Sequence, residues 1–385
     1  MGRQKGKIVT ESQGSRRVAV LGGGILGVST AVHLLRGGAG VVLVTESGIA
    51  SGASGRSLAW LNSAGAKSEA YHRLRMAGID RYRTLLAQRP GIDWLAFGGG
   101  LYWATAGEEA ATRERQRAEA AHGYDSRLLE SGDVPEVLPG IDPAVDPDAV
   151  SGAAVHNPGE GWVSLPHLVH HLMQEFTARG GELVDHAGKA RVALKDGRAA
   201  GLVLPDGREV GADTVLVAAG ADTPSLVKEL GVELPDASDL AMLVITEPVE
   251  TPLVAVLNTP RVSVRPHPGN RLAMDSTWYL DQLTRNSDGS YAVDPAVVQE
   301  LAGEASKVLA GRPELRAAEH LAGRKPVPGD GQPVLGELAA VPGCFVAFTH
   351  SGATLGLIAG ELLAGEILTG RRHPLLAEFR AERFS

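Results

Sequence analysis

Residues 18–46 read VAVLGGGILGVSTAVHLLRGGAGVVLVTE, and this stretch decides the fold of the part of the chain around it. The apolar run at 18–21 predicts a strand, the glycines of 22–27 predict a tight turn, and the apolar stripe after them predicts a helix. A second apolar run at 41–44 predicts another buried strand. The order strand, glycine-rich turn, helix and strand is typical of a dinucleotide-binding unit.

The glycines of this unit each have a separate expected role. Gly22 permits the turn out of the strand, Gly24 lets the backbone approach a pyrophosphate, and Gly27 lets the helix pack closely on the sheet. The free N–H groups of Ile25 and Leu26 open the helix, whose positive dipole end would face the phosphates.

Glu46 closes the unit at the tip of the second predicted strand. A carboxylate there can accept hydrogen bonds from both hydroxyls of an adenosine ribose, and it would repel a 2′-phosphate. The unit alone does not separate FAD from NAD as its ligand.

Length and composition predict two domains. The 385 residues exceed what one hydrophobic core usually serves, and 44% of them are hydrophobic, which is enough material for two cores. No apolar run approaches the roughly 20 residues that span a bilayer, so no membrane span is expected. The net charge of −8 argues against a nucleic-acid partner. Residues 1–15 lack the apolar stretch of a signal peptide and are predicted to be a disordered leader of a cytoplasmic protein.

The remainder of the chain predicts a mixed α/β protein with a second, largely antiparallel sheet at 240–290. Asp-Gly pairs at 196–197 and 206–207 predict tight hairpins. The stretch 51–66 reads as a loop that touches a ligand, and 135–147 as an irregular crossover. Helices are predicted at 71–88, 108–122, 165–179, 295–310 and 353–368, and strands at 100–105, 182–185, 212–220, 242–246, 261–265, 272–275 and 344–348.

These blocks, taken in order, resemble the FAD-dependent superfamily of D-amino-acid oxidase and glycine oxidase, which includes sarcosine oxidases and D-amino-acid dehydrogenases. The resemblance covers most of the chain. Its parts are the unit at 18–46, ASGRSLAW at 53–60, GWVSLPHLVHHL at 161–172, ADTVLVAAG at 212–220, KPVPGDGQPVLG at 325–336 and THSGATLGLIAGELLAGEIL at 349–368.

The resemblance implies a Rossmann-like FAD-binding domain of the glutathione-reductase type at 16–90, 150–235 and 325–385. It implies a substrate-binding domain at 91–149 and 236–324. In such a fold the first unit holds the ADP half of FAD, Ser47 lies beside the adenine, and Ala190 contacts it through the backbone. The other implied FAD contacts are Ser51, Ser54, Gly55, Arg56, Ser57, Leu58, Ala219 and Gly220.

The loop before the last helix is implied to contact the flavin ring itself. Its residues are Ser351, Gly352, Ala353, Thr354 and Leu355, and the N–H groups of the helix start would face the ring edge where negative charge develops. The alternative is an ordinary helix start capped by Ser351. Because a nicotinamide enzyme lacks this block, the resemblance favours FAD over NAD.

Members of this superfamily move a hydride from a carbon next to nitrogen to flavin N5, and the resulting imine is hydrolysed. Oxygen or another acceptor then reoxidises the flavin. The expected substrate is therefore a small amine or amino acid. Oxidation of a 2-hydroxy acid, or a non-catalytic role as the flavoprotein subunit of a larger assembly, are the alternatives. Substrate identity, stereochemistry, acceptor and oligomeric state are left open.

Four residues are candidates for the chemistry around the substrate. Glycine oxidases and D-amino-acid dehydrogenases carry a carboxylate-binding arginine just before the proline of the turn at 325–336, but this chain has Lys325 there, with Arg324 one residue earlier. Lys325 would hold a carboxylate as a point charge, Arg324 would swing in, or the substrate lacks a carboxylate. Arg265 is a further anion holder or a solvated strand arginine, and His350 would orient the substrate or tune the flavin.

Aromatic, histidine and cysteine residues supply weaker signals. Trp60, Asn62 and Trp162 are candidate pocket-lining residues, with ordinary packing as the alternative. The histidines at 167, 170 and 171 lack the carboxylate of a zinc motif, and no metal is expected. Cys344, the single cysteine, excludes intrachain disulfides. Its apolar neighbours predict a buried, inert thiol in preference to a covalent flavin link.

Overall fold

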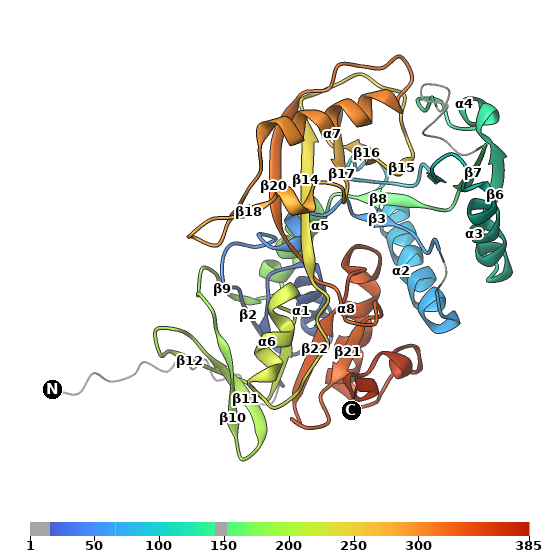
Figure 1. The fold of residues 1–385 in the computed structure, drawn as a ribbon. Coiled ribbons are helices and arrows are strands. Elements are labelled where there is room, and N and C mark those ends of the chain that lie inside the picture. The colour runs from blue at the N-terminus through green and yellow to red at the C-terminus, as the bar shows by residue number, and fades with distance from the viewer. Residues whose placement is uncertain (1–15, 66, 143–151, 385) are drawn as a thin grey trace. The chain divides into compact units, whose positions relative to one another are not determined.

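A computed structural model describes residues 16–65, 67–142 and 152–384, and within them the chain forms two compact units (Figure 1). Unit 1 holds the described residues up to Gly55, then Leu165–Asp239, and those from Arg324 onward; unit 2 holds the described parts of Arg56–Ser164 and Leu240–Gly323. These boundaries place 56–90 and 152–164 in unit 2, whereas the sequence grouped them with the nucleotide-binding domain. The functional assignment of the two parts stays a prediction.

Unit 1 is built on a six-stranded sheet in the order β21-β22-β13-β1-β2-β9. Neighbouring strands are parallel except β21, which runs antiparallel to β22. This is the arrangement that the buried apolar runs predicted. The strands are β1 (Arg17–Leu21), β2 (Gly40–Val44), β9 (Glu182–Val184), β13 (Thr214–Val217), β21 (Val334–Glu337) and β22 (Cys344–Phe348).

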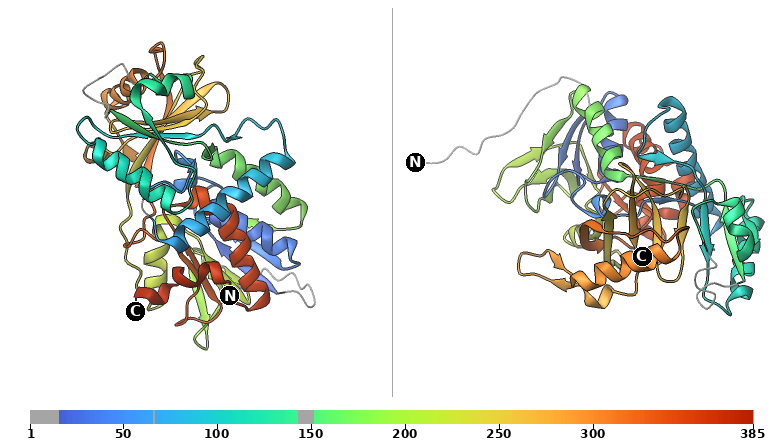
Figure 2. Two further views of the ribbon diagram at one scale, coloured as in Figure 1. Left: turned by 90° about the vertical axis from the view of Figure 1, so that its right-hand side faces the viewer. Right: turned by 90° about the horizontal axis from the view of Figure 1, so that it is seen from above.

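The predicted dinucleotide unit is present as β1, α1 (Ile25–Arg36) and β2. β1 lies between β13 and β2 and pairs with β2 from Arg17 opposite Gly40 to Leu21 opposite Val44. α1 packs against α8 (Gly352–Thr369) and α5 (Leu165–Ala178), and Figure 2 shows α1 and α8 side by side. The N-terminal strand, the C-terminal helix and a central segment of the chain thus share one core.

Smaller elements complete unit 1. β10 (Arg191–Lys195), β11 (Arg198–Val203) and β12 (Glu209–Gly211) form an antiparallel sheet, which confirms the two predicted hairpins. Both residues of the Asp196-Gly197 turn have positive φ, as a tight hairpin turn requires. The remaining helical segments are η1 (Ala53–Gly55), η4 (Gly220–Asp222), α6 (Thr223–Lys228), η6 (Pro374–Phe379) and η7 (Ala381–Phe384).

α8 bears on the expectation that the chain has no membrane span. By length and composition it is long and apolar enough to cross a bilayer, so the expectation that no apolar run approaches that length was wrong. However, 67% of this window is buried inside the protein. α8 is apolar on all sides because it is a core helix of unit 1.

Unit 2 is built on an eight-stranded sheet in the order β20-β14-β17-β16-β15-β5-β7-β6. The paired strands are antiparallel at the steps for which the register is defined, except β15 and β5, which are parallel. The prediction of a largely antiparallel second sheet is confirmed. Its strands are β5 (Gly100–Trp103), β6 (Arg127–Glu130), β7 (Ala153–Asn157), β14 (Asp239–Thr246), β15 (Val256–Asn258), β16 (Ser263–His267), β17 (Arg271–Asp275) and β20 (Ala317–Lys325).

The two faces of this sheet have different coverings because successive side chains of a strand point to opposite faces. One face packs under α7 (Pro295–Lys307), which crosses the sheet in Figure 1, and carries a large apolar core. That core includes Met242, Val244, Val264, Leu272 and Met274. The opposite face carries a smaller cluster from the alternate positions together with two residues outside the sheet: Leu243, Ile245, Val256, Ala273, Leu58 and Trp162. This second cluster is called the inner face below.

A three-stranded sheet contributes Trp60, Ala96 and Trp162 to the inner face, and short helices and strands complete unit 2. β3 (Trp60–Leu61) and β4 (Leu95–Ala96) pair with β8 (Gly161–Val163) on either side, and Trp60 lies opposite Trp162. The helices are α2 (Glu69–Gln88), α3 (Glu109–Ala121) and α4 (Val134–Val137), and two further short elements are β18 (Thr284–Arg285) and β19 (Tyr291–Ala292).

Two predictions about irregular segments need correction. The stretch 51–66 is not entirely loop, because it contains η1 and β3. The predicted crossover at 135–147 begins in α4, since a proline is compatible with the first turn of a helix. Its part from 143 onward, like the predicted leader at 1–15, lies outside the described residues.

Candidate cofactor and substrate sites

The turn after β1 leaves no room for side chains at two of its glycines. Gly22 has a φ of +126°, and a Cβ there would lie 2.1 Å from the carbonyl oxygen of Ala218 on the neighbouring strand segment. A Cβ on Gly27 would lie 2.0 Å from the carbonyl oxygen of Gly22. Glycine at both positions therefore lets the turn and α1 approach each other and β13 without a steric clash.

The start of α1 presents backbone donors without a side-chain cap from its own N-cap residue, Gly24. Of these donors, the Ile25 N–H donates to the Ser54 hydroxyl at 3.0 Å, which ties the predicted loop 51–58 to the helix start. No acidic residue lies in the first turn. The helix dipole here thus faces an environment suited to an anion.

Glu46 lies just beyond β2 and is exposed, and its carboxylate has no hydrogen bond or ion pair with a described residue. Its backbone carbonyl accepts a hydrogen bond from the Gly188 N–H at 3.0 Å. This bond brings the segment before Ala190 to the same edge of the sheet. At this edge the Glu46 carboxylate could accept hydrogen bonds from a ribose, and the backbone near Ala190 could contact an adenine base. These residues fit an adenine dinucleotide.

The start of α8 was predicted to face a flavin. Ser351 is the N-cap residue of α8, as the alternative of an ordinary helix start has it, but it makes no side-chain cap hydrogen bond. The flavin contact of this loop stays a prediction. The carbonyl of Ser351 accepts the first helical bond, from the Leu355 N–H at 2.9 Å, and the Ser351 N–H donates to the Thr349 hydroxyl at 3.0 Å. His350 is exposed in the turn before the helix.

The predicted cofactor residues are distributed over both units. Unit 1 contains most of them, and the structure places Ser47 just beyond β2, Ser51 in the loop beside it, Ala190 in the core, and Ala219 with Gly220 at the end of β13. Arg56, Ser57 and Leu58 belong to unit 2.

Arg324 forms ion pairs with two aspartates of unit 1. Its Nη1 donates to Asp222 Oδ1 at 2.9 Å, and its Nη2 donates to Asp236 Oδ2 at 3.1 Å. Asp222 ends the turn that contains Ala219 and Gly220, so these ion pairs brace that turn. Lys325, the next residue, is half-buried and forms no side-chain hydrogen bond or ion pair with the residues that the structure describes.

Arg265 lies in β16, and its side chain belongs with the inner face. It is 1% exposed, so the alternative of a solvated strand arginine is wrong. Its Nε donates to the Leu58 carbonyl, its Nη1 donates to the Pro266 carbonyl at 2.7 Å, and its guanidinium lies 5.0 Å from the centroid of the Trp162 ring. Burial lowers the pKa of Arg265 to about 9, and the charge of Asp275 offsets only part of this effect.

Glu160 is a buried acid that contacts Trp60 of β3. Glu160 is 0% exposed; its Oε2 accepts a hydrogen bond from Trp60 Nε1 at 2.6 Å, and its Oε1 accepts one from the Tyr124 hydroxyl at 2.6 Å. A Cβ on Gly100 would lie 2.0 Å from Oε2, so glycine makes room for the carboxyl group. Burial, together with the charge of Glu119, raises the pKa of Glu160 to about 8 against the two hydrogen bonds.

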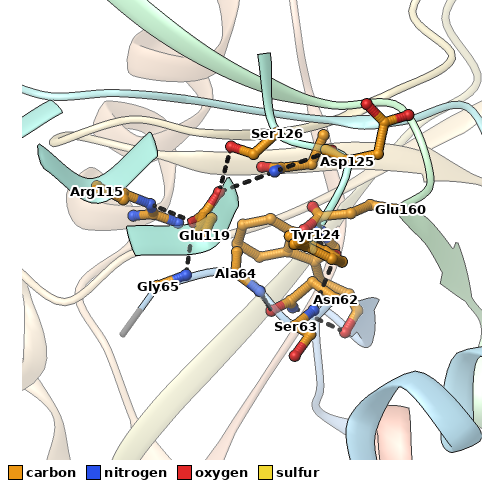
Figure 3. A network of polar contacts seen from close by, with 12 residues as sticks. Asn62, Ser63, Ala64, Gly65, Arg115, Glu119, Tyr124, Asp125, Ser126 and Glu160 are labelled. Atoms are coloured by element: carbon orange, nitrogen blue, oxygen red, sulfur yellow. Dashed lines mark hydrogen bonds and ion pairs between the residues drawn. The ribbon is translucent and has the colours of Figure 1, made fainter. Parts of the chain in front are cut away.

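Glu119 is the ionised neighbour of Glu160 in the same network (Figure 3). Its carboxylate accepts hydrogen bonds from the Gly65 N–H at 2.6 Å, Ser126 Oγ at 2.7 Å and Arg115 Nε at 3.0 Å. Burial by itself would raise the pKa of Glu119, but these donors, with Asn157, lower it. Two buried acids close to each other are thus held in different states by their surroundings.

This network could not be predicted from the sequence, because its members are far apart in the chain. The one signal was that Glu160 is the single charged residue of the block NPGEGWVSLP at 157–166. A lone charge inside an otherwise apolar and glycine-containing block is more often paired than solvated when it is buried.

Two further predictions concern cysteine and metals. Cys344 is buried in β22, and burial raises the pKa of its thiol to about 12, so it is unreactive at neutral pH. Within the described ranges no group of histidine, cysteine and acidic side chains is arranged to hold a metal ion.

Comparison with known proteins gives a consistent result over most of the chain. A family model, DAO, which describes FAD-dependent oxidoreductases, matches residues 17–366. The matched stretch includes the glycine-rich turn and the start of α8.

Individual relatives have named activities. A glycine oxidase from Pseudomonas aeruginosa is 25% identical over 370 residues, which cover 93% of this chain and 96% of the relative. An L-2-hydroxyglutarate dehydrogenase from Salmonella houtenae is 28% identical over 226 residues, which cover 56% of this chain and 50% of the relative. The crystal structure of glycine oxidase from Geobacillus kaustophilus has the same fold, with a TM-score of 0.78, 24% identity, and coverage of 95% of this chain and 99% of that one.

Proposed function

This chain belongs to the DAO family of FAD-dependent oxidoreductases, and on that premise we propose that it oxidises the C–N bond of an amino acid. FAD is the cofactor of the family, and the glycine-rich turn and Glu46 fit its ADP half. The relatedness to a glycine oxidase over nearly the full length supports nitrogen-bearing substrates.

We favour an amino acid over a simple amine because Lys325 has a positive charge without an ionic partner among the described residues. Of the cations predicted to hold a carboxylate, Arg324 is already paired with two aspartates and Arg265 is closed off from solvent, whereas Lys325 has no ionic partner among the described residues. A half-buried ammonium without a counter-ion attracts a carboxylate more strongly than one in bulk water. Lys325 is therefore the residue proposed to bind the substrate carboxylate, as a point charge.

The protein residues then act by binding rather than by acid–base chemistry. When bound, FAD accepts the hydride that leaves the carbon next to nitrogen, and water hydrolyses the imine product. The start of α8 offers backbone donors suited to negative charge that develops on a neighbouring group. The substrate amine must arrive neutral, so we expect turnover to increase with pH until the substrate amine is deprotonated.

Oxidation of a 2-hydroxy acid is the second candidate, and a specific observation favours it. The dehydrogenase from Salmonella houtenae, whose name refers to a hydroxy acid, matches this chain along 50% of its own length. A hydroxy acid carries the same carboxylate, so Lys325 would serve either substrate. The two proposals differ in whether nitrogen is released.

One experiment separates these proposals. The purified protein, yellow with bound FAD, is mixed without oxygen with amino acids, carboxylate-free amines and 2-hydroxy acids, and bleaching of the flavin spectrum is followed. We expect amino acids to bleach it and to release ammonia or a dealkylated amine, and Lys325→Met to raise the concentration of amino acid needed. Lys228→Met, at an exposed lysine of unit 1, is the matched control. Bleaching by hydroxy acids alone would support the second proposal, and no bleaching together with a copurifying protein would support a non-catalytic flavoprotein subunit.

A further inference from the structure

Lys67 is a lysine of unit 2 to which the proposed function gives no role. It lies directly before Ser68, the N-cap residue of α2, and its side chain is half-buried. Its Nζ folds back over Gly65, where a Cβ would lie 3.6 Å from it. Lys67 forms no side-chain hydrogen bond or ion pair with the residues that the structure describes. Its amine is therefore partly removed from water without a paired acid to keep it protonated.

Two arginines lie in the surroundings of this amine, and each is held in place. Arg75 of α2 donates from Nε to the Asn62 carbonyl and from Nη2 to Asn62 Oδ1, both at 2.8 Å. Arg115 of α3 donates from Nε to Glu119 Oε1 at 3.0 Å, and the Gly65 N–H donates to the same oxygen at 2.6 Å (Figure 3). Both guanidinium charges act on the amine and disfavour its protonated form.

The charges around Lys67 favour an uncharged or negative group at its Nζ. Burial lowers the pKa of Lys67 to about 8, and the charges of Arg75 and Arg115 act in the same direction. Glu119 and Glu160 oppose the shift, but Glu160 is largely protonated at pH 7 because its own pKa is raised to about 8. These groups then amount to three cations, Lys67 included, and one carboxylate. The start of α2 adds the positive end of a helix dipole.

We propose that Lys67 is a modification site for carbon dioxide, which its neutral ε-amine attacks to form a carbamate. The nitrogen lone pair forms the new N–C bond, one C=O electron pair moves onto oxygen, and the N–H proton passes to water. No oxidant or reductant is needed. The inference does not depend on the proposed function, because it concerns residues of unit 2 that take no part in it.

The chemistry of the site favours carbon dioxide over other electrophiles. The neutral amine is the nucleophilic form of lysine, and a small uncharged molecule can reach a half-buried amine. An acyl donor or an aldehyde would leave an uncharged group on the nitrogen and would gain nothing from the two arginines. A carbamate carries a negative charge, which Arg75, Arg115 and the start of α2 stabilise.

The test exposes the FAD-loaded protein to carbon dioxide and bicarbonate labelled with carbon-13 near pH 8. Triethyloxonium alkylates the carbamate so that it survives digestion, and peptide mass spectrometry locates the label. We expect the label at Lys67 to exceed that at the exposed Lys195 at least about tenfold, since an ordinary lysine is almost fully protonated there. Carbon-13 NMR of the intact protein should show a carbamate resonance that Lys67→Arg removes and that Lys195→Arg, the matched control, retains.

A second pair of variants tests the electrostatic part of the argument. Arg115→Gln removes one cation, and we expect the label at Lys67 to fall about fivefold, whereas Arg115→Lys should keep it within about twofold of the wild type. If Arg115→Gln does not fold, the pH dependence in the wild type decides. At constant dissolved carbon dioxide the label at Lys67 should reach half of its maximum near pH 8, while that at Lys195 is still rising.

Three results would overturn the inference: equal label at Lys67 and Lys195, an unchanged label in a folded Arg115→Gln, or the absence of a carbamate resonance in the wild type. None of these measurements involves turnover, so they leave the proposed function untouched. Conversely, a wild type that no amino acid reduces would still carry the label at Lys67.

Discussion

Replacement of Glu160 by glutamine should change how the stability of the protein depends on pH. The folded-state pKa of about 8 exceeds the ordinary value of 4.5, so between these values the unfolded chain releases a proton that the folded protein retains. Because the unfolded state then binds fewer protons, the free energy of unfolding falls as pH rises through this window. At about 1.36 kcal/mol per pH unit, the full window amounts to about 5 kcal/mol.

The expected magnitude over an accessible range is large enough to measure. Between pH 6 and pH 8 the wild type should lose about 2–3 kcal/mol of stability relative to Glu160→Gln. Urea unfolding of the FAD-saturated proteins at both pH values, followed by circular dichroism, gives this difference. Other groups that titrate in the range, such as Lys67, whose pKa burial lowers to about 8, are present in both proteins.

The reasoning would be refuted by a stability difference between the two proteins that stays constant from pH 6 to pH 8. Such a result would mean that Glu160 is ionised throughout, and that the hydrogen bonds from Trp60 and Tyr124 outweigh burial.

Three further predictions concern the cofactor and the substrate. Gly22→Ala places a Cβ against the Ala218 carbonyl at a positive φ, and should lower stability by about 1–3 kcal/mol and FAD retention, as thermal unfolding and the flavin absorbance of the purified protein would reveal. Glu46→Gln should weaken FAD binding about tenfold in calorimetric titration of the apoprotein, and unchanged affinity would exclude a ribose contact. Lys325→Met should raise KM for amino acids about tenfold but not KM for carboxylate-free amines, and equal effects on both classes would remove Lys325 from the carboxylate site.

The parts of the fold that the sequence predicted correctly are those governed by neighbours in the chain. The β1–α1–β2 unit depends on glycines a few positions apart, and the hairpin at Asp196-Gly197 depends on two adjacent residues that tolerate positive φ. The same local logic was incomplete at α4. Pro135 reads as a breaker in a window, but it is accommodated in the first turn of a helix.

The burial of Arg265 and Glu160 could not be predicted, because it depends on which distant segments of the chain pack over each side chain. Alternation in β16 indicates that Arg265 and Val264 face opposite sides of a sheet, but not that both sides are covered. Glu160 is harder still, because its partners Tyr124 and Trp60 are 36 and 100 positions away in the chain. Neither separation has a periodic signature, so only the folded chain reveals that the acid is buried and paired.

The ion pairs of Arg324 could not be predicted from the sequence either. The position of Arg324 beside Lys325 makes both cations candidates for holding a carboxylate, since the two residues are adjacent in the sequence. In the structure Asp222 and Asp236 already pair with Arg324, and these aspartates are 102 and 88 positions away. Long-range ion pairs of this kind decide which of two adjacent charges is available to a ligand.

We propose that this FAD-dependent oxidoreductase oxidises the C–N bond of an amino acid bound through its carboxylate. Anaerobic bleaching of the flavin by a panel of amino acids, with release of ammonia or a dealkylated amine measured in the same samples, tests it most directly. We expect bleaching with stoichiometric release of the nitrogen product, and a weaker response when the substrate carboxylate is removed. Bleaching by 2-hydroxy acids with no response to amino acids would contradict it.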